Sequence, residues 1–117
     1  PEKAKALLKE AGYENGKGLG EISISTVSDY TDLIEFVQHE LSTIGINVKV
    51  NVLQGPALRE QSAKGQLAVF RKSWLADYAD AENFLAVYYS PNFCPAGPNY
   101  THYKNEMFDQ KYIEAIQ

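Results

Sequence analysis

The sequence predicts an α/β fold with a mainly parallel sheet flanked by helices. Three apolar segments typical of strands, 21–27, 46–52 and 66–72, alternate with segments whose apolar residues repeat at helical spacing. The first two strands are separated by a long amphipathic helix, so they form a βαβ unit with parallel strands and a right-handed crossover. Strands that alternate with helices in this way are typical of α/β domains.

The composition is that of a folded protein. The 117 residues include 44% hydrophobic residues and carry a net charge of −4, from Lys+Arg 11 against Asp+Glu 15. These values exclude a disordered tail or a coiled coil, and the acidic balance disfavours nucleic acid as a partner. The single cysteine, Cys94, cannot form an internal disulfide and cannot hold zinc alone.

The first helix is expected from Pro1 to Ala11, with Gly12 as its end, because apolar residues recur along one face. A flexible glycine-rich turn over 15–20 follows it. The chain therefore begins within a predicted helix, and residues 111–117 still have helical character where the sequence stops. We expect the chain to be a piece of a longer protein.

The second helix follows the strand 21–27, where Ser28 or Asp29 is expected to cap it and Gly45 to end it. Its expected apolar face comprises Tyr30, Leu33, Ile34, Val37, Leu41 and Ile44. The strand 46–52 then alternates apolar and polar residues, which predicts one buried and one exposed face.

The remaining elements are less regular. A short helix is expected over 56–64, and the unbroken apolar run within 66–72 predicts a strand covered on both faces. Asp80 is expected to cap the next helix and Asn105 the last one. Between these helices, the proline-rich stretch 90–103 lacks periodicity, as expected of a long loop that is functional or disordered.

Candidate ligand-binding residues follow the third strand, where α/β sheets usually bind ligands. Trp74, the only tryptophan, and Asp77 lie just beyond its expected end. Spacing alone favours core and ligand-wall roles for Trp74 equally, and a lone aspartate such as Asp77 more often caps a helix or faces solvent. Most of the aromatic residues lie between Phe70 and Tyr112, so this half of the chain suits a binding surface.

Signals for catalysis are weak. Cys94 and His102 share the long loop, but no third group is evident that would orient them as nucleophile and base, and His39 fits an exposed helix position. The carboxylates of Asp77, Asp80 and Glu82 could suggest a cation site, although helix capping explains Asp80 and Glu82 more simply. We expect no enzymatic activity, no bound metal and no cofactor.

Several motifs together resemble one family. Residues 1–13, PEKAKALLKEAGY, and the segment from Gln38 to Val48 are similar to successive parts of the family 5 extracellular solute-binding proteins of peptide ABC transporters. Residues 74–85, WLADYADAENFL, resemble that family's W-x-x-D-Y-x-D-P-x-N-F segment, and residues 97–109 resemble its N-Y-x-x-Y-x-N-x-x-F-D segment. The resemblance covers the whole chain in order.

The resemblance implies a periplasmic binding protein type II-like lobe, with residues 1–117 as part of the C-terminal lobe of a larger bilobed protein. It implies oligopeptide or dipeptide binding in an interlobe cleft for uptake through an ABC permease. Asp77 matches the residue that holds the peptide α-ammonium group, Trp74 the wall of a side-chain pocket, and Arg71 a receptor for a peptide carboxylate. Tyr78 belongs to the same expected ligand-binding set.

The resemblance leaves the cargo open. The family also has nickel-, haem- and sugar-binding members and a transcription regulator with a ligand-sensing domain. The chain departs from the common pattern at Ala81, where proline is frequent, and at Lys72 and Ser73, which replace smaller residues. The implied location is the periplasm or the outer face of the membrane, with a lipoprotein anchor as one form.

Overall fold

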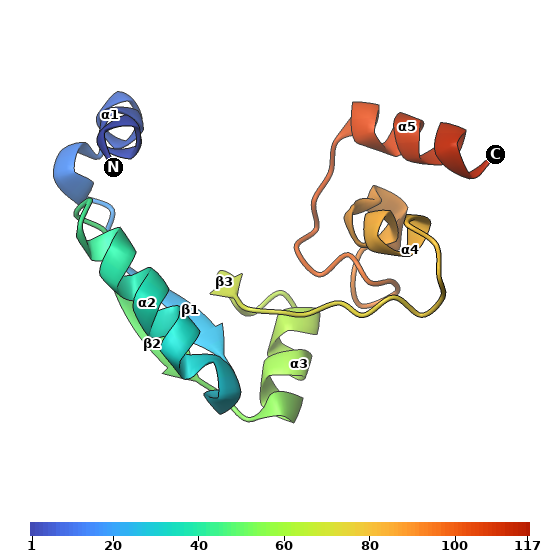
Figure 1. The fold of residues 1–117 in the computed structure, drawn as a ribbon, viewed down its shortest axis with the longest axis horizontal. Helices are drawn as coiled ribbons and strands as arrows, with labels where there is room; N and C mark the ends of the chain where they lie inside the picture. The colour runs from blue at the N-terminus through green and yellow to red at the C-terminus, as the bar shows by residue number, and fades with distance from the viewer. The chain divides into compact units, whose positions relative to one another are not determined.

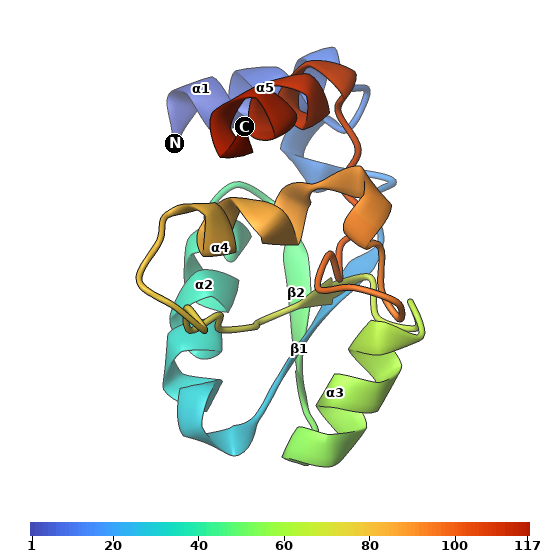
Figure 2. The same cartoon turned by 90° about the vertical axis from the view of Figure 1, so that its right-hand side faces the viewer.

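The computed structural model describes all residues, 1–117, and divides into two compact units (Figures 1 and 2). The first unit comprises Pro1–Leu58 and Leu67–Arg71, and the second comprises Arg59–Gln66 and Lys72–Gln117. None of the helices combines the length and the apolar character that crossing a bilayer requires.

The first unit is built on a three-stranded sheet with the order β2-β1-β3. β1 (Glu21–Thr26) pairs in parallel with β2 (Asn47–Val52) over its whole length, and with β3 (Val69–Phe70) over two residues. The predicted parallel sheet is therefore confirmed. In this order β1 is central, so the carboxyl ends of β1 and β3 are neighbours at one edge of the sheet.

The core of this unit lies between the sheet and α2 (Thr31–Ser42), which runs along the β1–β2 pair in Figures 1 and 2. Ile24, Ile34 and Val48 are its buried residues, one from each element. The amide of Gln38 donates a hydrogen bond of 2.7 Å to the carbonyl oxygen of Val48, which ties the helix to the edge strand. The alternation of apolar residues in both strands predicted this packing.

The start of α2 differs from the prediction. Ser28–Tyr30 form a 3₁₀ turn, Tyr30 occupies the N-cap position, and no side chain caps the helix. The expected cap by Ser28 or Asp29 is therefore wrong. The 3₁₀ turn moves the start of the helix beyond both predicted caps. The hydroxyl of Thr31, the first residue of the helix, donates to the carbonyl oxygen of Ser28 at 2.9 Å.

The third strand is also shorter than expected. Only Val69 and Phe70 join the sheet, and Val69 is 41% exposed, so the prediction of a strand covered on both faces is wrong. β3 is an edge strand with a single partner, and a short apolar run cannot distinguish that position from a buried one.

The turn after α1 (Glu2–Glu10) lies tightly against the loop that precedes β2. A 3₁₀ turn covers Glu14–Gly16, and a Cβ atom on Gly16 would lie 1.9 Å from the carbonyl oxygen of Gly45. The reciprocal atom on Gly45 would lie 2.1 Å from the carbonyl oxygen of Asn15. Both glycines have positive φ, so the contact requires glycine for space and for conformation.

The second unit is mainly helical. α3 (Gly55–Ala63) extends into it from the first unit, and α4 (Glu82–Leu85) continues as a 3₁₀ turn over Ala86–Tyr88. The last helix, α5 (Glu106–Ile116), lies beside α4 in Figure 1.

Asn105 caps α5 as predicted, because its side-chain oxygen accepts a 2.9 Å bond from the backbone N–H of Phe108. Ala81 is the N-cap of α4, one residue later than predicted, but the carboxylate of Asp80 still accepts from the N–H of Glu82.

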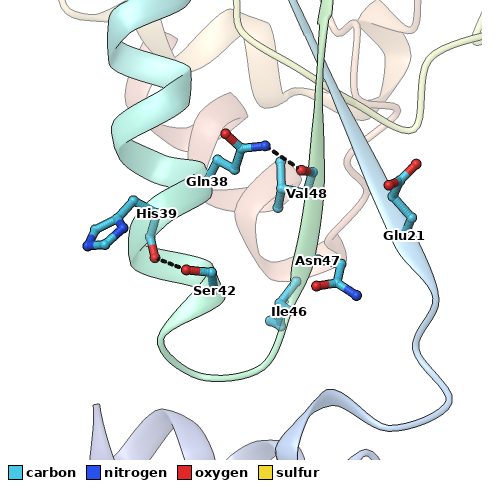
Figure 3. A pocket seen from close by; sticks show the side chains of 7 residues that line it. All are labelled: Glu21, Gln38, His39, Ser42, Ile46, Asn47 and Val48. Atoms are coloured by element: carbon cyan, nitrogen blue, oxygen red, sulfur yellow. Dashed lines mark hydrogen bonds between the residues drawn. The ribbon is translucent and has the colours of Figure 1, made fainter.

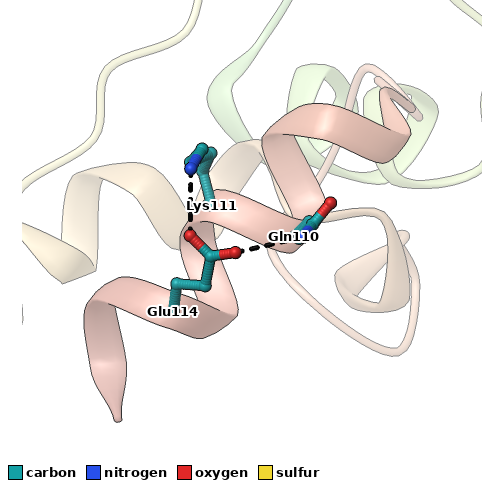
Figure 4. Close-up of polar contacts among 3 residues, drawn as sticks. All are labelled: Gln110, Lys111 and Glu114. Atoms are coloured by element: carbon teal, nitrogen blue, oxygen red, sulfur yellow. Dashed lines mark hydrogen bonds and ion pairs between the residues drawn. The ribbon is translucent and has the colours of Figure 1, made fainter.

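The exposed face of α5 carries local polar contacts. Glu114 accepts from the amide of Gln110 at 3.1 Å and pairs with the ammonium of Lys111 at 3.0 Å (Figure 4). Exposed pairs at this spacing contribute only about 0.2–0.5 kcal/mol each to helix stability. The opposite face of the helix buries Tyr112.

The long loop 90–103 is organised around one asparagine. Asn99 has no exposed surface, and its amide donates to the carbonyl oxygens of Tyr89 and Tyr103, at 3.1 and 2.9 Å. Its side-chain oxygen accepts from the backbone N–H of Tyr103, at 3.1 Å. These bonds close the loop on itself, so its lack of periodicity reflects a specific irregular fold.

Candidate functional site

Arg71 lies directly after β3, at the carboxyl edge of the first unit's sheet. Its backbone N–H donates to the carbonyl oxygen of Ser25, at 2.9 Å, which fixes the residue beside the end of β1. Its guanidinium lies 3.3 Å from the ring centroid of Tyr30. No ion pair in the structure involves Arg71, so this cation is stabilised by an aromatic face and has no carboxylate partner in the chain.

Tyr30 was expected on the buried face of α2, and its contact with Arg71 is a feature that sequence reasoning missed. The ring is 37% exposed and sits at the helix start, which is the end of the helix nearest the carboxyl edge of β1. No signal in the sequence links two residues so far apart in the chain.

The other three expected ligand-binding residues, Trp74, Asp77 and Tyr78, belong to the second unit. The indole of Trp74 is half-buried, and its Nε1–H donates to the side-chain oxygen of Asn83, at 2.9 Å. The backbone N–H of Asp77 donates to the same oxygen, at 3.0 Å. The structure thus brings Trp74 and Asp77 together on one acceptor.

The carboxylate of Asp77 is exposed and accepts no hydrogen bond from the chain. It joins none of the ion pairs. The carboxylate of Asp80, by contrast, accepts from the backbone N–H of Glu82 at the start of α4. Asp77 therefore has a backbone N–H held by Asn83 and a carboxylate that faces solvent.

Tyr78 is linked to the helices behind it through Glu82. The two carboxylate oxygens of Glu82 accept hydrogen bonds from the hydroxyls of Tyr78 and Tyr112. Burial, together with the bond to Glu82, raises the pKa of Tyr112 to about 12. The bond to Glu82 likewise raises the pKa of Tyr78, which remains 53% exposed.

The acidic cluster does not form a metal site. Asp80 accepts from a backbone N–H and Glu82 from two hydroxyls, so only Asp77 lacks a partner. No group of three or more His, Cys, Asp or Glu side chains in the structure could hold a metal ion.

Cys94 and His102 are close in space, but their contact involves the backbone. The imidazole Nε2 of His102 lies 2.8 Å from the carbonyl oxygen of Cys94, and its ring stacks on Phe93 with centroids 4.7 Å apart. The Cys94 side chain is buried. The hydrogen bond between these two residues thus runs from the imidazole to a backbone oxygen and not to the thiol.

Lys72, one of the positions at which the chain departs from the common family pattern, places its ammonium against an aromatic ring. Its ammonium lies 3.5 Å from the ring centroid of Tyr100. Partial burial lowers the pKa of Lys72.

A hollow of about 390 Å³ lies at the amino edge of the first unit's sheet (Figure 3). It is lined by Glu21, Gln38, His39, Ser42, Ile46, Asn47 and Val48. Because Glu21 and Asn47 begin their strands, this hollow is opposite the carboxyl edge that carries Arg71. The imidazole of His39 points away from the strands in Figure 3, as expected of an exposed helix position.

Comparison with known proteins identifies the family. The model of the bacterial extracellular solute-binding proteins, family 5, middle region, matches residues 1–93. The chain belongs to this family. The resemblance seen in the sequence is therefore confirmed, and so is the expected α/β solute-binding fold.

Individual relatives agree with this assignment. The glutathione-binding protein GsiB of Escherichia coli (strain K12) is 31% identical over 123 residues, covering 100% of this chain and 24% of the relative. The HbpA2 structure from Haemophilus parasuis matches with a TM-score of 0.86 and 28% identity, over 99% of this chain and 24% of that one. DppA from Helicobacter pylori, solved in complex with the peptide STSA, matches with a TM-score of 0.81 and 32% identity, over 97% of this chain and 22% of that one.

The chain thus spans about a quarter of the length of the curated relatives it matches.

Proposed function

We propose that this chain is part of the C-terminal ligand-binding lobe of a bilobed solute-binding protein that captures peptides for uptake by an ABC transporter. The observation that carries the proposal is the exposed, unpaired carboxylate of Asp77, held beside the half-buried Trp74. Family membership supports the proposal. Two relatives are named as a glutathione-binding and a dipeptide-binding protein, and a third was solved in complex with the peptide STSA.

In this proposal Asp77 binds the α-ammonium group of the peptide. An ammonium removed from water needs a charged partner, and charge-assisted hydrogen bonds are the strong ones. The backbone N–H of Asp77 is already bonded to Asn83, so the loop is ordered before ligand arrives and less entropy is lost on binding.

Trp74, Tyr78 and Arg71 complete the proposed set. The indole of Trp74 supplies an apolar wall whose polar edge is already satisfied, and Tyr78 supplies a second ring next to Asp77. Arg71 is the proposed receptor for a peptide carboxylate, since its guanidinium has no acidic partner in the chain.

Capture in this class of protein involves closure of two lobes over the ligand. No bond in the peptide is broken, so the protein acts in binding and delivery and not as an enzyme. The family's extracellular character supports a location in the periplasm or, with a lipid anchor, at the outer face of the membrane. The proposed partner there is the membrane permease of the transporter.

The cargo is testable by isothermal titration calorimetry on the intact protein. The ligand panel comprises di-, tri- and tetrapeptides, glutathione, Ni²⁺, haem and simple sugars. We expect peptides to bind with the highest affinity. Saturable binding of Ni²⁺, haem or a sugar with no peptide binding would overturn the proposal in favour of another cargo, and an upstream DNA-binding module would indicate a sensor.

The role of Asp77 has a matched control. Asp77→Asn removes a charge-assisted bond worth about 1.5–3 kcal/mol, so peptide affinity should fall by about 10- to 100-fold. Asp32→Asn changes an exposed carboxylate in the first turn of α2 and should leave affinity unchanged. Equal affinities for the two variants would refute the assignment of Asp77.

A further inference from the structure

Asn83 is a buried residue whose side-chain oxygen is bonded to two of the proposed ligand-binding residues of the second unit, Trp74 and Asp77. The residue is the second of α4 and is only 5% exposed. Its side-chain oxygen accepts from the indole N–H of Trp74, at 2.9 Å, and from the backbone N–H of Asp77, at 3.0 Å. The two donors are three residues apart, so a single buried atom fixes both ends of the segment 74–77.

The backbone N–H of Asn83 bonds to the carbonyl oxygen of Asp80, at 3.2 Å, which holds the residue at the start of α4. No buried side-chain polar atom in the structure is left without a partner, so this acceptor is fully used.

We propose that Asn83 is the positioning residue of the ligand-binding loop, setting the indole plane of Trp74 and the backbone of Asp77 before ligand arrives. The expected effect of Asn83 on peptide affinity rests on the proposed function. Its effect on the order of the loop in the ligand-free protein does not, and can be tested separately.

The chemistry favours asparagine at this position. The residues 71–78 form no helix or strand beyond β3, so the segment has no ladder of backbone hydrogen bonds to hold it. A buried amide oxygen can accept two hydrogen bonds, while an apolar residue of similar size would accept none. Without that acceptor, the indole N–H of Trp74 and the backbone N–H of Asp77 would be left unpaired or would turn toward water. The backbone that carries the Asp77 carboxylate would then no longer be held in one position.

The test compares three variants of the intact protein. Asn83→Leu removes the acceptor at similar volume, and Asn83→Asp retains an oxygen in the same place. Asn92→Leu is the matched control, because the amide of this half-buried asparagine bonds only to the carbonyl oxygen of Ala86 and touches neither Trp74 nor Asp77.

The first readout is hydrogen exchange of the segment 74–80 in the ligand-free protein, measured by mass spectrometry. Loss of one net hydrogen bond corresponds to about a tenfold change in an opening equilibrium. We therefore expect exchange in this segment to be about tenfold faster in Asn83→Leu, and nearly unchanged in Asn83→Asp and Asn92→Leu. Equal exchange in Asn83→Leu and the parent protein would overturn the proposal.

The second readout is peptide affinity by calorimetry. We expect it to be weakened by about tenfold or more in Asn83→Leu and by less than about threefold in Asn83→Asp, if loop order before binding sets the affinity. If Asn83→Leu fails to fold, Asn83→Asp decides, and fast exchange of 74–80 in that folded variant would contradict the inference. If the parent protein binds no peptide, the proposed function fails, while the exchange experiment still tests Asn83.

Discussion

The close contact between Gly16 and Gly45 allows a quantitative test of the first unit. Gly16 has φ +77°, and a Cβ atom there would meet the Gly45 carbonyl oxygen at 1.9 Å and its carbonyl carbon at 2.6 Å. Gly20 has φ +75°, but a Cβ atom there would have nothing within 4 Å. Alanine at either position carries the same left-handed strain, and only alanine at Gly16 adds a backbone collision.

The expected magnitudes follow from these two terms. A non-glycine residue in the left-handed region costs roughly 1–2 kcal/mol, so Gly20→Ala should lower the free energy of unfolding by about 1 kcal/mol. Displacing packed backbone to admit an extra methyl group costs about 1–3 kcal/mol more. Gly16→Ala should therefore lower the free energy of unfolding by about 3 kcal/mol, and Gly45→Ala should behave like it.

The assay is urea unfolding of the 117-residue chain, followed by far-UV circular dichroism. The quantity of interest is the difference between Gly16→Ala and Gly20→Ala, in which the common strain cancels. Equal losses of stability in the two variants would refute the close approach of the two turns. Any greater loss for Gly20→Ala would contradict the strain argument as well.

Three further outcomes are expected. Asn99→Ala removes four bonds, one of them long, from a fully buried side chain and should lower the free energy of unfolding by about 3 kcal/mol, while Asn92→Ala removes one and should cost about 1 kcal/mol; similar urea midpoints for the two would count against the loop description. Asn105→Ala removes the cap of α5 and should cost about 1 kcal/mol, whereas unchanged thermal unfolding would show that the cap is not needed. The pKa of Tyr112 is raised to about 12 in the folded state, so its contribution to stability is complete below about pH 10 and is lost as the pH rises toward 12. Absorbance at 295 nm should show a late tyrosine titration that is missing in Tyr112→Phe, and identical titrations of the two proteins would contradict the burial of this hydroxyl.

The sequence predicted those parts of the fold in which regularly spaced apolar residues of a helix or strand pack into the core. Ile24 and Val48 alternate with polar neighbours and Ile34 follows helical spacing, so the parallel βαβ core was predictable. The cap at Asn105 was predictable for a similar reason, because the residue that accepts and the N–H that donates are only three positions apart.

Contacts between distant or irregular segments could not be predicted. The Arg71–Tyr30 contact joins the end of the third strand to the start of α2, and only the register of the sheet brings them together. The role of Asn83 depends on the path of an irregular loop, for which no periodic pattern exists. β3 is short because it lies at the edge of the sheet, and a run of apolar residues in the sequence does not show whether a strand is central or at the edge.

The central claim is that the carboxylate of Asp77 binds the ammonium group of a peptide. It is tested most directly by a double-mutant cycle on the intact protein, with calorimetry of one peptide in free and N-acetylated form against the parent and Asp77→Asn. We predict that acetylation weakens binding to the parent by about tenfold or more and weakens binding to Asp77→Asn only slightly, because charge and partner are then both absent. The same acetylation penalty in both proteins would contradict the claim.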